Sequence, residues 1–289
     1  MGILHVTGGT FRLALGDWVI HPEVILLGFL LLWGYTYAVT ELRPKVSDAG
    51  RVRRSQMILF FLGVFSLYLA GSSPLDELSD WLVSAHMAQH VILTTVAPPL
   101  IIAGVPSWLW AWLVKVSRLE PLLRKALHPI VALALFNGIV LIFHLPFAVE
   151  LQVRSDLFHF FAHLFLVVAG IVMWWPVLAS LPSLPKLSYP LQMAYLFVQS
   201  LVPSFLASFL TFSDRLLYPT YPARGMLWGL SPVHDQQIGG LVMKLAPSII
   251  MWAFIGWAFF RWYAEFEARE RGPRWEEVET ELRRLGLDE

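Results

Sequence analysis

The chain of 289 residues contains no cysteine. This absence excludes disulfides, iron–sulfur clusters and thiolate metal sites, so any metal ion must be held by histidine, methionine, carboxylate or carbonyl groups. Charge is scarce as well: 15% of the residues are charged, against roughly a quarter in soluble domains. Basic and acidic residues number 21 each, so no net charge indicates nucleic acid as a partner. The composition therefore excludes an ordinary soluble domain.

Hydrophobic residues are abundant, at 57% of the chain, and they occur in long runs. A membrane-spanning helix needs roughly 20 mostly apolar residues. The runs predict an all-α bundle of seven transmembrane helices, and they lie at 22–40, 56–72, 79–104, 129–147, 155–178, 190–212 and 235–262.

Two further segments complete the predicted organisation. The stretch 105–127 is rich in tryptophan and ends with basic residues, which favours a helix lying in the membrane interface. Residues 1–262 then form one transmembrane domain, with no repeat of fixed period. Residues 263–289 form a charged helical tail in solvent.

The distribution of lysine and arginine predicts the topology. The connections 41–55, 105–128 and 179–189, together with the C-terminal tail, hold 16 basic residues, whereas the alternate set holds four. Cytoplasmic loops carry the positive excess in multi-pass proteins. We therefore expect the N-terminus outside and the C-terminus in the cytoplasm, which requires an odd number of spans. The N-terminus lacks the basic start and short apolar core of a signal peptide.

Two pairs of histidines lie inside predicted spans, where ionisable residues are costly and suggest function. His86 and His90 are four residues apart and share one helix face, and His159 and His163 repeat this spacing. Both pairs fall in the outer half of the predicted bilayer. If the two helices pack together, they offer three or four imidazoles to one ion such as copper, zinc, iron or nickel.

Other polar or sulfur-bearing residues near this depth are weaker candidates. Met87 and Met243 offer thioethers, which suit Cu(I). His144 and His234 lie at the outer ends of their helices, where each serves equally well as a structural hydrogen-bonding residue.

Three further polar residues lie on the last predicted span. Lys244 lies near mid-membrane with no deep carboxylate in any predicted span, so we expect it to face a water-filled cavity or an anionic ligand, unless its helix begins later than predicted. Asp235 caps the start of its own helix, or with Gln236 orients a histidine.

Three motifs resemble the CtaG-type assembly factors of caa3-class cytochrome c oxidases. They are HMAQHVILTTVAPPLIIAGVP at 86–106, HLPFAVE with HFFAHLFLVVAGIVMWWPVL at 144–150 and 159–178, and LSPVHDQQIGGLVM at 230–243. The motifs occur in the family's order, and the resemblance covers about Trp18 to Trp262. The chain departs from the pattern at Lys244, where the family commonly has an aromatic residue.

The resemblance implies a multi-pass protein of the bacterial plasma membrane that is not an enzyme. It implies an assembly factor that delivers Cu(I) to the binuclear copper site of a haem–copper oxidase, with the oxidase catalytic subunit and other assembly factors as partners. The expected copper ligands are His86, His90, His159 and His163. The sequence leaves open whether the chain forms a homodimer.

Two alternative functions use the same histidines. A haem-binding membrane protein would take one axial ligand from each histidine pair. A metal or proton transporter would need a path to the cytoplasm, yet the cytoplasmic halves of the predicted helices carry almost no ionisable residues. Neither alternative requires the motif resemblance.

Overall fold

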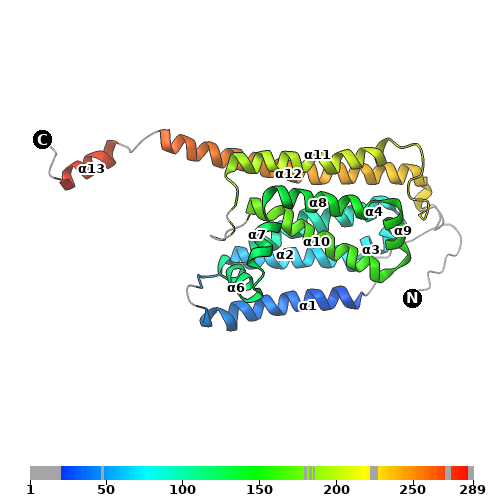
Figure 1. The fold of residues 1–289 in the computed structure, drawn as a ribbon, viewed down its shortest axis with the longest axis horizontal. Coiled ribbons are helices and arrows are strands. Elements are labelled where there is room, and N and C mark those ends of the chain that lie inside the picture. The colour runs from blue at the N-terminus through cyan, green and yellow to red at the C-terminus, as the bar shows by residue number, and fades with distance from the viewer. Residues whose placement is uncertain are drawn as a thin grey trace.

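The chain forms a bundle of long helices running along one common direction (Figure 1). The computed structural model describes residues 21–46, 49–178, 181, 184, 186–221, 227–270 and 275–285, and among them no residue belongs to a strand. The N-terminal segment 1–20, predicted to lie outside the membrane, is not among the described residues.

The first half of the chain contributes the helices α1 to α7, two short π-helices (η1 and η3) and one 3₁₀-helix (η2). Their bounds are α1 Pro22–Tyr37, η1 Ala38–Leu42, η2 Arg43–Lys45, α2 Arg54–Ser72, α3 Pro74–Ser79, α4 Val83–Val91, η3 Ile92–Val96, α5 Ala97–Gly104, α6 Ser107–Ser117 and α7 Glu120–Ala126.

The second half contributes the remaining helices. Their bounds are α8 Pro129–Phe143, α9 Pro146–Arg154, α10 Asp156–Leu178, α11 Tyr189–Phe212, η5 Leu227–Gly229, α12 Pro232–Glu270 and α13 Trp275–Leu285. Many of these helices have proline in their first turn, where its missing N–H and fixed φ cost nothing.

Within the described residues, six helices are long and apolar enough to cross a membrane, and a seventh is added if α7 and α8, bent by 75°, count as one span. The predicted fourth span, 129–147, is shorter than expected. It ends at Phe143, and a separate helix begins at Pro146, because proline has no N–H to continue the preceding helix. The predicted interfacial stretch 105–127 is two helices, broken at Arg118 in the left-handed conformation (φ 56°).

The span formed by α4, η3 and α5 is the centre of the bundle. Inside the protein, 72% of its most apolar window is buried, against 39% or less for every other candidate span. It packs against α2 on one side and α12 on another, while α12 also pairs with α11 along its length (Figure 1). The residues best shielded from lipid are therefore those of α4 and α5.

A π-helical turn, η3, interrupts this central span. Pro98 follows the turn and has no N–H to donate to the carbonyl oxygen of Thr94, four residues earlier. The indole N–H of the buried Trp174 on α10 donates to that oxygen instead, at 3.2 Å. Gly170 allows the approach, since a Cβ there would lie 2.7 Å from the same oxygen. The proline and the glycine thus bring α10 against η3 and α5.

Candidate metal centre

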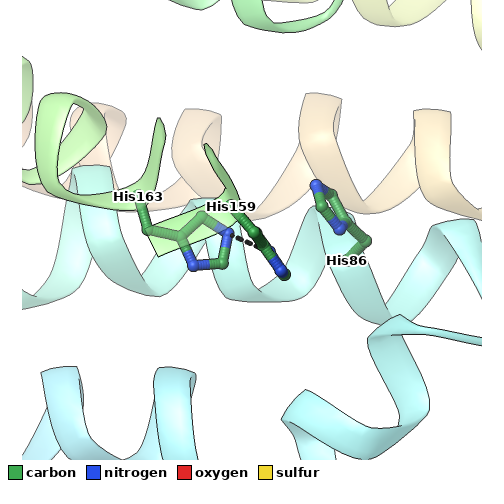
Figure 2. Close-up of side chains that lie close together, drawn as sticks. All are labelled: His86, His159 and His163. Carbon is green, nitrogen blue, oxygen red and sulfur yellow. Dashed lines mark hydrogen bonds between the residues drawn. The ribbon is translucent and has the colours of Figure 1, made fainter. Parts of the chain in front are cut away.

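Five histidines from three segments form one cluster at the end of the bundle where α4 and α10 begin. Figure 2 shows the His86 ring of α4 beside the His159 ring of α10, with His163 also in the group. One nitrogen from each of these three residues can be chosen so that all lie within 4.8 Å of one another. Three of the four paired histidines therefore come together at one place, and the ring of His90 lies beside them, 4.3 Å from that of His86.

The four paired histidines form two layers, one helical turn apart. His86 and His159 make the outer layer, with ring centroids 5.3 Å apart and planes nearly parallel. His90 and His163 make the inner layer, also at 5.3 Å. Within each helix the two rings are 4.3 Å and 4.1 Å apart, as the spacing of four residues dictates. The arrangement is a compact cage of imidazoles.

Within the part of the chain that the structure describes, two ring nitrogens of this cage have no hydrogen-bond partner. The Nε2 atoms of His86 and His90 are both buried and unpaired, although a buried polar atom without a partner normally costs about 1–3 kcal/mol. His159 and His163 hydrogen-bond each other through their Nε2 atoms at 2.9 Å. Unpaired nitrogens on rings that pack against other imidazoles fit a site that can hold a metal ion.

The fifth histidine, His144, lies at the C-terminal end of α8, beside His90 of the inner layer. Its Nε2 is 3.2 Å from the Nδ1 of His90, and its own Nδ1 is 2.7 Å from the carbonyl oxygen of Val140. The Tyr218 hydroxyl donates to the His144 carbonyl oxygen at 2.9 Å. Tyr218 was not a candidate in the sequence, because its loop lies far along the chain from α8.

The start of α4 is capped by a residue from another helix. The Asp235 carboxylate on α12 accepts hydrogen bonds from the backbone N–H of Val83 at 2.6 Å and from the N–H and hydroxyl of Ser84. The sequence predicted a cap on the helix of Asp235 itself, or a contact with a histidine. The correct role is a cap on α4, and it fixes the first turn ahead of His86.

Gln236, the next residue, forms hydrogen bonds at the same end of the bundle. Its side chain accepts from the backbone N–H of Leu217 at 2.7 Å and donates to the carbonyl of Arg215 at 3.1 Å. It therefore holds the loop that carries Tyr218, and it makes no hydrogen bond to a histidine among those found for the described residues.

A large cleft opens beside the cage. It has a volume of about 1830 Å³, runs between α1, α2 and α10, and is lined by apolar side chains except at the end where His159 and His163 lie. Asp76, Asp80 and Asp156 line that end and act electrostatically on His159. The two α10 histidines of the cage, His159 and His163, are thus reached from a cleft with an acidic mouth.

His21, at the N-terminus of α1, binds one of these carboxylates. Its Nε2 is 2.9 Å from the Asp76 carboxylate, which also accepts from the amide of Gln89 at 2.7 Å. The bond to Asp76, aided by Glu23, raises the pKa of His21 to about 9. A protonated His21 therefore ties α1 to α3 at neutral pH.

The remaining candidates lie outside the cage. His234 is exposed at the start of α12. Met87 and Met243 belong to the largest hydrophobic cluster of the core. Lys244 is half-buried between α12 and α11, with its Nζ 3.5 Å from the Ser208 hydroxyl and 5.7 Å from the centre of the Phe212 ring. Lys244 has no ion pair among those found for the described residues.

A profile of known protein families matches most of the chain. The profile is that of the cytochrome c oxidase caa3 assembly factor, Caa3_CtaG, and it covers residues 33–265. The chain belongs to this family. The match includes every helix of the histidine cage, and it confirms the resemblance carried by the three motifs. The family is one of assembly factors for cytochrome c oxidase.

Curated relatives come from mycobacteria. An uncharacterized protein of Mycobacterium bovis and one of Mycobacterium tuberculosis are each 24% identical over 275 residues, covering 84% of this chain and 40% of the relative. One of Mycobacterium leprae is 23% identical, covering 78% and 36%. The chain thus spans about two fifths of these relatives' length. No solved structure matches it.

Proposed function

We propose that the caa3 assembly factor described here binds copper, as Cu(I), in its histidine cage and passes it to a haem–copper oxidase during assembly. Copper is the cargo in this proposal and not a resident cofactor. The observation that carries it is the convergence of the buried His86 with the partly buried His159 and His163, whose nitrogens lie within 4.8 Å of one another.

The geometry of the cage suits a small imidazole-bound ion. A metal 2.0 Å from three nitrogens in a plane holds those nitrogens about 3.5 Å apart, so modest side-chain rotations close the cage around it. The His159–His163 hydrogen bond at 2.9 Å gives way to two metal–nitrogen bonds. Imidazole without thiolate accepts copper, and Cu(I) tolerates few ligands, which permits stepwise ligand exchange.

The position of the cage supports transfer within the membrane. The resemblance to the family implies an acceptor site held by histidines inside the oxidase. A donor cage at similar depth would exchange the ion sideways, so no bare cation would cross hydrocarbon. His159 and His163 line the open cleft, which makes them the ligands that a partner can reach first.

Copper titration of the purified protein tests the proposal. We expect about one Cu(I) per chain from competition with a chromophoric chelator, and loss of that binding in the double variant His86→Ala, His163→Ala. His234→Ala is the matched control, because His234 is exposed and lies outside the cage. Equal copper binding by the double variant and the control would refute the assignment.

The haem alternative has weaker support. The rings of His86 and His159 are stacked at 5.3 Å with planes 15° apart, so their nitrogens do not point at each other across a gap that admits a porphyrin plane. Axial ligation requires that opposed geometry. A visible spectrum separates the two ideas, since a Soret band in the purified protein would favour haem.

A further inference from the structure

The hydrogen bonds behind the inner layer select one protonation pattern of the cage. The chain of contacts runs from the Val140 carbonyl to His144 and on to His90. A carbonyl oxygen only accepts, so the His144 Nδ1, at 2.7 Å from it, carries a proton and donates. The Nε2 of a neutral His144 then has a lone pair.

His144 is neutral because nothing compensates a charge there. It is 4% exposed, and its ring contacts among the described residues are the Val140 carbonyl and His90, with no carboxylate. A buried, unpaired imidazolium among other imidazoles would cost several kcal/mol. Its Nε2 therefore accepts the 3.2 Å hydrogen bond from His90, and the proton of His90 lies on Nδ1.

The position of this proton determines the state of the other ring nitrogen of His90, Nε2. With its proton on Nδ1, the Nε2 of His90 carries a lone pair, and this atom is buried and has no hydrogen-bond partner among the described residues. The ring lies 4.3 Å from that of His86 and 5.3 Å from that of His163. A lone pair held in place beside two other imidazoles is what a metal ligand requires, since the partner of one ring nitrogen decides which nitrogen binds metal.

We propose that His144 is a positioning residue that fixes His90 in its Nδ1–H form, so that His90 Nε2 joins the copper site as a further ligand. This inference rests on the proposed copper function, and it adds a role for a histidine that does not itself touch the metal. The Val140 carbonyl fixes His144, and Tyr218 secures the same turn through the His144 carbonyl.

Nitrogen-15 NMR of histidine-labelled protein without copper tests the inference directly. We expect His90, assigned by its loss in His90→Gln, to show a protonated Nδ1 and a bare Nε2. In His144→Leu the acceptor is gone, and we expect the His90 proton to move to Nε2. In His144→Gln the amide oxygen accepts in place of Nε2, and we expect the wild-type pattern to remain.

Copper affinity gives the second readout. We expect His144→Leu to bind Cu(I) roughly 10- to 100-fold more weakly, the range found for residues that orient metal ligands, and His144→Gln to stay close to wild type. The unfolding temperatures of both variants show whether either one has lost packing. If His144 only supported the fold, two variants of equal stability would bind copper equally weakly.

The outcomes separate this inference from the copper function. A protonated His90 Nε2 in the wild-type protein would overturn the role of His144, as would unchanged copper affinity in His144→Leu or equal losses in both variants. The predicted proton positions without any copper binding would instead overturn the copper function and leave the tautomer assignment standing.

Discussion

At the scale of single residues, the sequence located the histidines of the cage but not the groups that hold them. The spacing of His86 and His90, and of His159 and His163, follows from helix periodicity and is visible in one dimension. The partners of those rings come from distant segments. Asp235 lies 152 residues from Val83, and no local pattern indicates which helix start a buried carboxylate will cap.

Removing the charge of Asp235 should loosen α4. In Asp235→Asn one acceptor oxygen becomes a donor facing the N–H groups of Val83 and Ser84, and a lost cap of this kind costs about 1–2 kcal/mol. We expect a lower unfolding temperature in detergent and weaker Cu(I) binding. Asp214→Asn, an exposed carboxylate at the same end, is the control, and equal melting of the two variants would contradict the role.

The His21–Asp76 contact predicts a pH dependence. The pKa of His21 is raised to about 9, above its ordinary value of about 6.5, so the pair stabilises the fold fully below pH 6.5 and loses its contribution as the pH rises through 9. The side chains of His21 and Asp76 are both partly exposed, so solvent screens the pair and the effect is under about 1 kcal/mol. As the pH rises from 7 to 10, the unfolding temperature should fall more for the wild type than for His21→Gln. The same dependence on pH in both proteins would argue against a stabilising His21–Asp76 pair.

At the scale of elements, hydropathy predicted most of the long helices because a span's length is set by the bilayer. The breaks were harder to foresee. The π-turn η3 depends on Pro98 together with the distant donor Trp174. The early end of α8 depends on Pro146, which starts a short helix that the hydropathy pattern did not predict. These features reflect tertiary contacts, which no sliding window includes.

Gly170 gives the element-scale prediction. A Cβ at this position would lie 2.7 Å from both the Thr94 oxygen and Pro98 Cγ, so Gly170→Ala must push α10 away from η3. Overpacking of this kind costs about 1–3 kcal/mol, and it moves His163 relative to His90. We expect a lower unfolding temperature and weaker Cu(I) binding.

The matched control is Gly256→Ala on α12. A Cβ there meets nothing within 4 Å, and alanine gains up to about 1 kcal/mol over glycine in an open helix position. If both alanine variants melt alike and bind copper alike, then the close approach at Gly170 does not hold the two halves of the cage together.

At the scale of the whole molecule, the histidine cage and the basic loops lie at opposite ends of the bundle. α4, α10 and α12 begin at the cage end, where Asp76, Asp156 and Asp235 lie, and α12 runs away from it towards α13 (Figure 1). Lys125 lies in the last turn of α7, next to the start of α8 at the other end of the bundle. Successive spans run in opposite directions, so alternate loops lie at opposite ends of the bundle. These two sets of loops are the ones between which the basic residues were counted.

This separation predicts how the protein lies in the membrane. Positive loops stay in the cytoplasm, so the cage end should face outwards, where an arriving cation meets the acidic mouth before the imidazoles. The chain has no cysteine, so single cysteines report position without background. We expect Asp214→Cys in intact cells to react with a membrane-impermeant maleimide, and Lys125→Cys to react only after the membrane is opened. Both positions are exposed. The reverse pattern would place the cage on the cytoplasmic side and would require copper to be loaded from within the cell.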